Sequence, residues 1–418
     1  MSHLISVEEA LTRILAQIRP LEVEPSPLLD ALERVLTEDI IAESDIPPFD
    51  NSAMDGYAVV AADTAAPPVT LRVTGEIAAG DTCDGQRVEP GTAMRIMTGA
   101  PVPSGADAVI RFEQTSEFST SGRRRGPVHA VSVDVVATVQ PGDNIRHAAE
   151  DVQGGSTVLR AGTVLRPQEI GMLAALGCAT VNVHRRPRVA ILATGDELVA
   201  IDEPVAPGKI RNVNEWTTAA LTRRYGATPF CLGIAHDRIE DLKAKVQDGL
   251  AQQPDLFLTS AGVSVGDFDM VKDVLASAGH MEFWSVAIKP GKPMAFGSIG
   301  GVPLIGLPGN PVAAMVSFEQ FVRPALLKMA GRTTWRKPTV MAILQEELEN
   351  SGRRNYVRAV VERCGEVYHV RSVREQGAGV LSSMLRANGL LVVPEGVRHL
   401  HAGDIVDVQM LDWNEHFF

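Results

Sequence analysis

Apolar residues recur at helical spacing near the beginning of the chain. Leu11, Ile14 and Ile18 follow one another three or four residues apart, so they share one face of a predicted helix. Ser6 precedes this pattern and is followed three residues later by a glutamate, which is the arrangement of a capping box. A second helical pattern covers residues 28–36, behind a stretch interrupted by prolines. We therefore expect two helices near the beginning of the chain.

Between residues 187 and 330, apolar runs of strand length alternate with longer helical patterns. Strands that alternate with helices are typical of a parallel sheet joined by right-handed crossovers. Ligands of such sheets bind beyond the carboxyl ends of the strands, so polar residues at those ends become candidates for a site. The expected strands are 188–193, 230–234, 255–259 and 302–307, and the expected helices are 214–224, 239–250 and a long apolar one that ends near 329.

The segments on either side of this α/β region alternate short β-rich runs with Gly and Pro turns. Residues 69–139 are typical of a small all-β module, and the chain from about Lys337 onward is typical of a separate small barrel or sandwich. A further helix is expected at 168–176. Because 418 residues exceed what a single hydrophobic core supports, we predict a multidomain α/β plus β protein of two to four domains.

The chain is acidic, with 39 basic and 51 acidic side chains and a formal net charge of −12. Nucleic-acid binding needs a basic face, so we expect no nucleic-acid partner. An anionic substrate must instead be met by a local cluster of positive charge.

The cysteines and the first residues bear on the compartment. Cys83, Cys178, Cys231 and Cys364 lack the spacing of a zinc site, and we assign them no chemistry. The first residues are acidic where a secretory signal would be basic and apolar, and no apolar run is long enough to cross a bilayer. We expect a cytoplasmic protein with no membrane partner.

Acidic residues follow the strands of the predicted sheet. Glu197 follows the first strand, Asp237 the second, and Asp267 and Asp269 the third. Each aspartate taken alone is explained as a helix N-cap, because helices are expected to begin at these points. Together on one rim, the acids also make a plausible site for a hard cation such as Mg²⁺ beside phosphate groups.

Two loops are candidates for binding an anion. In the turn 307–311, Asn310 can cap a helix and Pro311 suits its first position, which leaves backbone N–H groups free for an anion. A tight strand-to-helix turn without a ligand explains the same residues. Lys289 and Lys292 lie on a stiff loop framed by prolines and a glycine, so their charges stay together. This loop is the local positive cluster that an oxyanion or phosphate would need.

Seven strings carry a family resemblance. They occur in the order PPFDNSAMDGYAV (47–59), MRIMTGAPVP (94–103), PGDNIR (141–146), TGDEL (194–198), GVSVGDFD (262–269), IKPGKPMAFG (288–297) and GLPGNPVA (306–313). In this combination the chain resembles the MoeA and gephyrin E-domain family, the molybdopterin molybdotransferases, over nearly its whole length. No single string would be sufficient.

The resemblance implies an elongated homodimer of four-domain subunits with the active cleft between subunits. Its central α/β domain is shared with the enzymes that adenylylate molybdopterin, and its last domain is a C-terminal β-barrel. The implied division is 1–22 with 185–330 as the α/β molybdopterin-binding domain, 23–45 with 140–184 as the linker and dimerisation domain, 46–139 as the small β-rich domain and 331–418 as the barrel.

The resemblance also implies a reaction. Molybdate is joined to adenylylated molybdopterin, AMP is released, and a divalent cation, usually Mg²⁺, is required. Molybdate is a tetrahedral dianion, which suits lysines and an arginine, while a metal would absorb charge as the phosphate link breaks. The adenylyltransferase of the preceding step and the molybdoenzymes that accept the cofactor are implied as further partners.

Family residues are carried over position by position. Asp237 and Asp269, with Glu197, are assigned to the Mg²⁺ and phosphate-link site, and Lys289, Lys292 and Arg358 to the oxyanion. The remaining assigned positions are Asp55 and Thr98, which would close the cleft across the dimer, Pro308 and Pro311 of the PGNP turn, and Ser383 or its neighbour Ser382 beside molybdate. The alternative for Asp55 is a turn residue ahead of a glycine.

Four positions depart from the usual family text. Ala261 and Ala149 replace glycines, Ser285 replaces a frequent lysine, and Ala313 replaces a frequent serine or threonine. These changes are compatible with activity. Three alternatives stay open: a gephyrin-like scaffold that binds without catalysis, an adenylyltransferase, and a paralogue that inserts tungstate.

Overall fold

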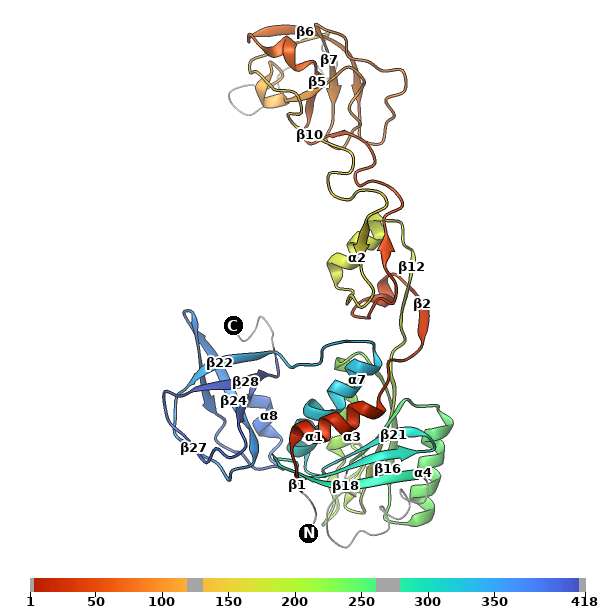
Figure 1. Ribbon diagram of the computed structural model, residues 1–418, viewed down its shortest axis with the longest axis vertical. Helices are drawn as coiled ribbons and strands as arrows, with labels where there is room; N and C mark the ends of the chain where they lie inside the picture. The colour runs from red at the N-terminus through yellow and green to blue at the C-terminus, as the bar shows by residue number, and fades with distance from the viewer. Residues whose placement is uncertain (1–3, 119–130, 261–278, 413–418) are drawn as a thin grey trace. The chain divides into compact units, whose positions relative to one another are not determined.

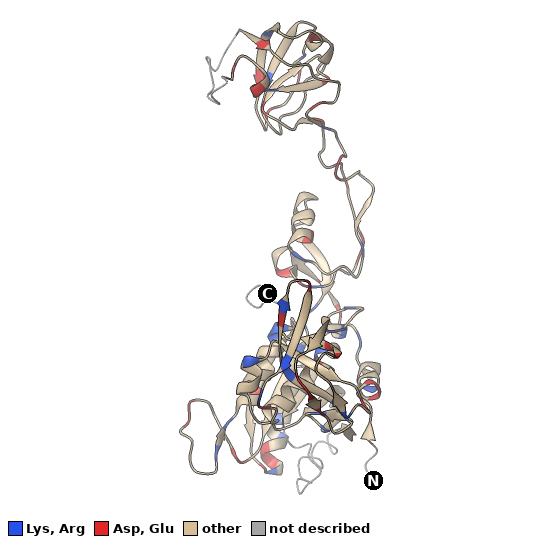
Figure 2. Cartoon of the chain, turned by 90° about the vertical axis from the view of Figure 1, so that its left-hand side faces the viewer, with Lys and Arg blue, Asp and Glu red and all other residues tan. Residues whose placement is uncertain are grey.

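The computed structural model describes residues 4–118, 131–260 and 279–412. The chain forms two compact units, a first one made of residues 1–37, 162–166 and 180–418 and a second one made of residues 38–161 and 167–179. Acidic and basic residues are interspersed over the elements of both units (Figure 2). Among the described residues, no helix is long and apolar enough to span a membrane.

The first unit contains a seven-stranded sheet in the order β1-β18-β20-β21-β17-β13-β16 (Figure 1). The four strands from β21 to β16 are parallel, as predicted, whereas β18 and β20 add an unpredicted antiparallel edge. The strands are β1 (Leu4–Ile5), β13 (Arg188–Thr194), β16 (Thr228–Ala235), β17 (Leu256–Ser260), β18 (Gly279–Val286), β20 (Pro293–Ile299) and β21 (Val302–Leu307).

Helices cover both faces of this sheet. Alternate residues of β13 point to opposite faces, so Val189 and Ile191 join the larger apolar core with α1, α3 and α7, while Ala190 and Leu192 pack with α4. Ser6 caps the first helix as predicted, its hydroxyl accepting the Glu9 N–H at 3.1 Å. The helices are α1 (Val7–Gln17), α3 (Val213–Arg224), α4 (Ile239–Ala251), α6 (Pro311–Ser317) and α7 (Arg323–Met329).

The predicted long apolar helix that ends near Met329 is interrupted. A π-helical turn, Phe318–Val322, separates α6 from α7. Pro324 stands in the first turn of α7, and because proline has no N–H it removes one i→i−4 hydrogen bond at this point. The interruption therefore lies next to Pro324, whose effect on the helix cannot be read from the spacing of apolar residues alone.

The last part of the chain is a closed barrel, which decides between the barrel and the sandwich that the sequence left open. Its five strands pair in the order β24-β25-β22-β28-β26, and β26 pairs back to β24. The strands are β22 (Thr339–Leu344), β24 (Arg354–Cys364), β25 (Val367–Ser372), β26 (Gly389–Val393) and β28 (Ile405–Met410). The barrel region also holds the short helix α8 (Ser382–Arg386) and the antiparallel pair β23 (Leu348–Glu349) and β27 (His399–Leu400), and β19 (Ile288–Lys289) is added to β24.

The helix predicted at 28–36 is wrong. Only Leu29–Ala31 forms a short 3-10 turn. The backbone N–H groups of Glu33 and Leu36 donate instead to the carbonyls of Leu165 and Thr163, which lie far along the chain. These long-range hydrogen bonds replace the local ones that a helix would need. The segment around it pairs β2 (Val23–Pro27) with β12 (Thr180–His184).

The second unit is built around a five-stranded sheet in the order β8-β5-β7-β6-β9, with buried apolar side chains on both of its faces. The strands are β5 (Gly56–Val59), β6 (Val69–Ile77), β7 (Thr92–Ile96), β8 (Ala108–Arg111) and β9 (Ser132–Val135). The unit also holds the pairs β3 (Ile40–Ile41) with β11 (Thr157–Leu159) and β4 (Asn51–Ser52) with β10 (Ile145–Arg146), and the predicted helix α2 (Pro167–Ala175).

Candidate functional site

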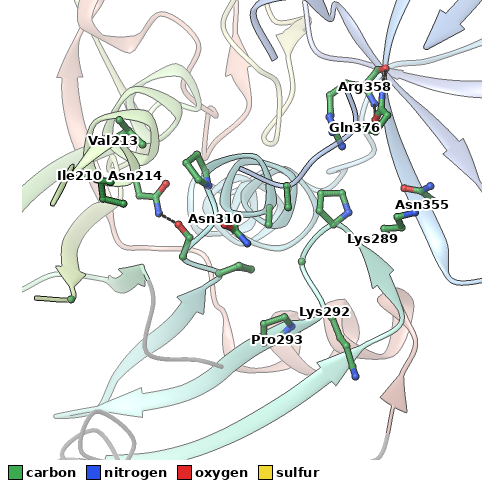
Figure 3. Close-up of a pocket in the computed structure, with 18 of the residues that line it drawn as sticks. Ile210, Val213, Asn214, Lys289, Lys292, Pro293, Asn310, Asn355, Arg358 and Gln376 are labelled. Carbon is green, nitrogen blue, oxygen red and sulfur yellow. Dashed lines mark hydrogen bonds between the residues drawn. The ribbon is translucent and has the colours of Figure 1, made fainter. Parts of the chain in front are cut away.

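A cavity of about 760 Å³ lies in the first unit, between the carboxyl ends of the parallel strands and the barrel. Its α/β wall comes from the segments after β13, β16 and β21 and from the loop between β19 and β20, and its barrel wall comes from β24 and the segment after β25 (Figure 3). The predicted site residues that line it are Glu197, Asp237, Lys289, Lys292, Pro308, Pro311 and Arg358.

Acidic side chains gather at one end of this cavity. Asp196 Oδ1 accepts the backbone N–H of Asp237 at 3.2 Å. Glu197 folds back over Gly195, since a Cβ built on that glycine would lie 2.4 Å from Glu197 Oε2. Burial, followed by the negative charges of Asp196 and Glu197, raises the pKa of the Asp237 carboxyl. This end of the cavity therefore offers hard oxygen ligands and a surplus of negative charge, which suits a divalent cation.

Asp237 does not cap a helix, so the capping interpretation is wrong for this residue. The residue before α4 is Arg238, whose side chain makes no capping hydrogen bond. Asp241, in the first turn of α4, instead accepts the backbone N–H of His236 at 2.7 Å through its carboxylate. Asp267 and Asp269 lie outside the described residues.

Arg358 lies on the barrel side of the same cavity. Its side chain is 1 % exposed, and among the residues that the structure describes it forms no ion pair with a carboxylate. Within the described ranges its guanidinium donates to three neutral oxygens, the Gly377 carbonyl at 3.2 Å, the Glu375 carbonyl at 3.4 Å and the Ser383 hydroxyl at 3.3 Å. Burial lowers the pKa of Arg358 to about 10. A buried cation without a counter-ion is costly, and an anion in the cavity would offset that cost.

The Ser383 hydroxyl positions this arginine. It is fully buried, donates to the Val380 carbonyl at 2.7 Å and accepts the Arg358 Nε–H. Ser383 does not line the cavity itself. Its neighbour Ser382 is exposed and contacts Arg386 rather than Arg358. Of the two serines considered from the sequence, Ser383 is thus the one that touches the arginine.

The two lysines of the loop 288–293, called the lysine loop below, lie in different surroundings. Lys289 is half-buried and pairs in β19 with Asn355 of β24, whereas Lys292 is exposed and extends away from Arg358 (Figure 3). Gly291 has a φ of +109°, and a Cβ there would lie 2.6 Å from the Ser317 Oγ. Glycine is therefore required for the loop to reach α6 so closely.

The PGNP turn forms the predicted start of a helix, with Pro311 in the first turn of α6. Asn310 occupies the N-cap position, but its side chain makes no capping hydrogen bond. The Val312 N–H donates to the Ala378 carbonyl at 3.0 Å. The turn thus offers fewer free backbone donors than the sequence predicted.

Asp55 and Thr98 belong to the second unit and contact each other there. Asp55 Oδ1 accepts both the backbone N–H and the hydroxyl of Thr98, each at 2.7 Å. These hydrogen bonds lower the pKa of the Asp55 carboxyl, the backbone N–H of Thr98 having the largest effect. The structure thus brings together two residues that the sequence analysis singled out in separate strings.

Several residues that line the cavity were missed from the sequence. Asn214 donates to the Gly309 carbonyl at 2.7 Å, while its buried Oδ1 has no hydrogen-bond partner among the described residues. Asn355 is 7 % exposed, and Arg353 donates to the Ile288 carbonyl at 3.2 Å. Only Asn214 carried a signal, because it begins the helix expected at 214–224, the first helix after the predicted strand 188–193, and such helices start near the carboxyl edge of the sheet.

The departures from the family text fall in different surroundings. Ala313 is buried and lines the cavity, whereas Ser285 is buried in β18 between β1 and β20 and does not line it. Ala149 has a φ of 63°, in the left-handed region that favours glycine. Ala261 lies outside the described residues.

Three family models match the chain in sequence. The MoeA N-terminal region (domain I and II) matches residues 5–177, a probable molybdopterin binding domain matches residues 190–328, and the MoeA C-terminal region (domain IV) matches residues 342–411. The matches follow one another along the chain and leave only short stretches uncovered.

Curated relatives match nearly the full length. A molybdopterin molybdenumtransferase of Haemophilus influenzae is 36% identical over 411 residues, covering 97% of this chain and 98% of the relative. Molybdopterin molybdenumtransferase 2 of Mycobacterium tuberculosis is 39% identical over 412 residues, covering 96% and 97%. The enzyme of the same name from Bacillus subtilis is 35% identical over 413 residues, covering 97% and 94%.

Solved structures agree with these relatives. A molybdopterin biosynthesis MoeA protein of Pyrococcus horikoshii is 33% identical, with a TM-score of 0.78 and coverage of 98% of this chain and 100% of the other. A second MoeA structure from the same genus has a TM-score of 0.79 at 30% identity, with the same coverage. Sequence and fold therefore agree over the whole chain, which belongs to the MoeA family of molybdopterin molybdenumtransferases.

Proposed function

We propose that the chain transfers molybdenum from molybdate to adenylylated molybdopterin in molybdenum cofactor biosynthesis, with release of AMP and with Mg²⁺ as the metal. The names of the full-length relatives support the reaction type. The observation that carries the proposal is the buried Arg358 guanidinium, which has no carboxylate partner among the described residues and faces the same cavity as Glu197 and Asp237.

Arg358 and Lys289 would hold molybdate. Both line the cavity, and β19 pairs with β24 so that Lys289 lies beside Asn355, three residues before the arginine. A dianion needs charged donors, and a planar guanidinium gives directed hydrogen bonds to its oxygens. Lys292 is exposed, so its charge would attract the anion rather than bind it directly.

Glu197 and Asp237 fit a Mg²⁺ ion, together with Asp269, which lies outside the described residues. Carboxylate oxygens are the ligands that Mg²⁺ takes beside phosphate groups, and Asp237 is not used to cap a helix. When bound, the ion would draw negative charge from the phosphate link as AMP leaves. The chain's own part is to hold these acids on the α/β wall of the cavity whose barrel wall carries the guanidinium.

The domain division and the assembly are further parts of the proposal. The pairing of β1 with β18 supports a domain that joins 1–22 to 185–330, and the pairs β2–β12 and β3–β11 support one that joins 23–45 to 140–184. Residues 46–139 and 331–418 would form the other two domains. By resemblance we propose a cytoplasmic homodimer in which Asp55 and Thr98 reach the cleft of the partner subunit.

The test is molybdate-dependent release of AMP from adenylylated molybdopterin by the purified full-length protein in Mg²⁺. We expect Arg358→Lys to weaken the apparent affinity for molybdate about 10- to 100-fold. Arg363→Lys, on an exposed part of the same strand, is the matched control and should leave it unchanged. Asp237→Asn should lower the rate and the affinity for Mg²⁺, whereas Asp248→Asn on the surface of α4 should not.

The outcomes separate the alternatives. Binding of adenylylated molybdopterin without any release of AMP would support a scaffold and overturn the transferase. Transfer of AMP from ATP to free molybdopterin would support an adenylyltransferase. A preference for tungstate over molybdate in the same assay would identify the paralogue reaction.

A further inference from the structure

A second cluster of ligating side chains lies on the outside of the barrel, on the pair β23 and β27. In this antiparallel pair Leu348 faces Leu400 and Glu349 faces His399. The leucines pack against the barrel core, so their alternating neighbours project outward. The sequence Glu-x-Glu on one strand therefore stands opposite His-x-His on the other, with Glu347 and His401 as the remaining members.

The four side chains converge closely. His399 Nε2 lies 2.5 Å from a Glu347 oxygen, His399 Nδ1 lies 2.9 Å from Glu349 Oε1, and His401 Nδ1 lies 3.2 Å from the same Glu347 oxygen. One ligand atom from each of Glu347, His399 and His401 lies within 4.8 Å of the others. Ligand atoms around a tetrahedral zinc ion are about 3.3 Å apart, so small side-chain rotations would bring these three to that spacing.

The hydrogen bonding of His399 indicates that the cluster calls for a cation. A neutral imidazole has one donor nitrogen and one acceptor nitrogen, yet both nitrogens of His399 face carboxylate oxygens. A carboxylate cannot donate to the acceptor nitrogen when it is ionised. The arrangement is thus satisfied either by a second proton on His399 or by a positive ion shared between the groups.

We propose that Glu347, His399 and His401, with Glu349 beside them, bind a divalent transition-metal ion of the Zn²⁺ type. Two imidazoles with carboxylates suit Zn²⁺ and its neighbours, whereas Mg²⁺ prefers oxygen ligands alone. The three ligands are exposed, so water would complete the coordination. The site differs from the proposed Mg²⁺ site, because of its four members only Glu349 also lines the cavity.

The test uses metal-free, full-length protein in excess Mg²⁺, titrated with Zn²⁺ and followed by calorimetry. We expect His399→Asn and His401→Asn each to weaken one Zn²⁺ equivalent at least about tenfold. His280→Asn is the matched control, because His280 is an exposed histidine that also faces a single glutamate, Glu282, at 3.6 Å. It should leave the titration unchanged.

Co²⁺ provides a second measurement, which reports the kind of ligand atoms around the metal. The wild type should give the visible absorption of nitrogen-coordinated Co²⁺, and both cluster variants should lose it while keeping their circular dichroism. A wild type that takes up no more Zn²⁺ than the His399→Asn and His401→Asn variants, with no difference in the Co²⁺ spectrum, would overturn the proposal. The release of AMP is scored separately, so failure of the transferase proposal does not affect this result.

Discussion

Asp55 and Thr98, 43 residues apart, are joined by two hydrogen bonds to a single carboxylate oxygen, one from the threonine backbone and one from its hydroxyl, each 2.7 Å long. Asp55 directly precedes β5, and Thr98 follows β7, the neighbouring strand. The pair thus fixes the connection at one end of the sheet of the second unit. The other carboxylate oxygen, Oδ2, accepts no hydrogen bond from a described residue.

Replacing Thr98 by valine removes one of these hydrogen bonds and should destabilise the second unit by up to about 1 kcal/mol at neutral pH. The lowered pKa of Asp55 contributes stability that is present above its ordinary value of 3.8 and is lost as the pH falls through the folded-state value. The gap between wild type and variant should therefore shrink below pH 3.8. Urea unfolding at a series of pH values measures it.

Thr82→Val is the control for this change, because Thr82 is exposed in the same unit and forms no hydrogen bond through its hydroxyl with a described residue. Its effect on unfolding should be small and independent of pH. A gap for Thr98→Val that persists unchanged in acid would contradict the role given to the Asp55 carboxylate.

Gly291→Ala should destabilise the lysine loop more than a positive φ alone explains. A left-handed conformation costs a residue with a Cβ roughly 1–2 kcal/mol, and here the Cβ would also lie 2.6 Å from Ser317 Oγ. Gly301→Ala is the matched control, since Gly301 has a φ of +82° and no atom within 4 Å of the added Cβ. Thermal unfolding should show the larger loss for Gly291→Ala, together with weaker binding of molybdate.

The clash can be tested directly. Ser317→Ala removes the obstructing hydroxyl, whose oxygen has no hydrogen-bond partner among the described residues. In combination with Gly291→Ala it should restore part of the lost stability. Equal losses for Gly291→Ala and Gly301→Ala would show that the contact with α6 is not limiting.

Ala149→Gly should stabilise the protein. Ala149 has a φ of 63°, and this left-handed conformation destabilises the folded state by about 1–2 kcal/mol. Glycine relieves that strain but loses more chain entropy on folding, which offsets about 0.5–1 kcal/mol of the gain. We expect a net gain of about 0.5–1 kcal/mol in chemical unfolding. Ala148→Gly, next to it and without a positive φ, should lower stability instead. A loss for both variants would refute this account of the strain.

Lys337→Met should cost about 3–5 kcal/mol, because it leaves a buried carboxylate without its cation. Lys337 Nζ lies 2.5 Å from Glu319 Oε2, and the two side chains are 5% and 2% exposed. Adding Glu319→Gln to the variant should recover part of the loss. The exposed pair Arg371–Glu362 is the control, and Arg371→Met should cost no more than about 1 kcal/mol. Equilibrium unfolding in urea compares the three variants.

The elements that local pattern defines could be predicted from the sequence. The helix expected at 239–250 occurs as Ile239–Ala251, because its apolar positions recur at helical spacing within one short stretch of sequence. The segment 28–36 was mispredicted for the opposite reason. Its N–H groups bond to carbonyls about 130 residues away, and no window of the sequence contains both partners.

The candidate site shows the same division. The acids and lysines could be found because they follow strand ends and turns. The surroundings of Arg358 could not be predicted. Its guanidinium bonds to carbonyls of the segment 375–377 and, among the described residues, to no carboxylate, and this depends on how that segment folds around it. The contact between Glu347 and His401 could not be predicted either, because it depends on the register of β23 against β27, and the spacing of residues in the sequence does not determine that register.

The two-residue strand β19 has a consequence for how ligands are selected. Ile288 and Lys289 are joined to Arg354 and Asn355 by backbone pairing, so the barrel cannot swing away from the lysine loop without breaking the ladder. The two walls of the cavity are consequently assembled before a ligand arrives. A ligand therefore spends less of its binding free energy on bringing these two walls together, which leaves more of it for contacts with the lining residues.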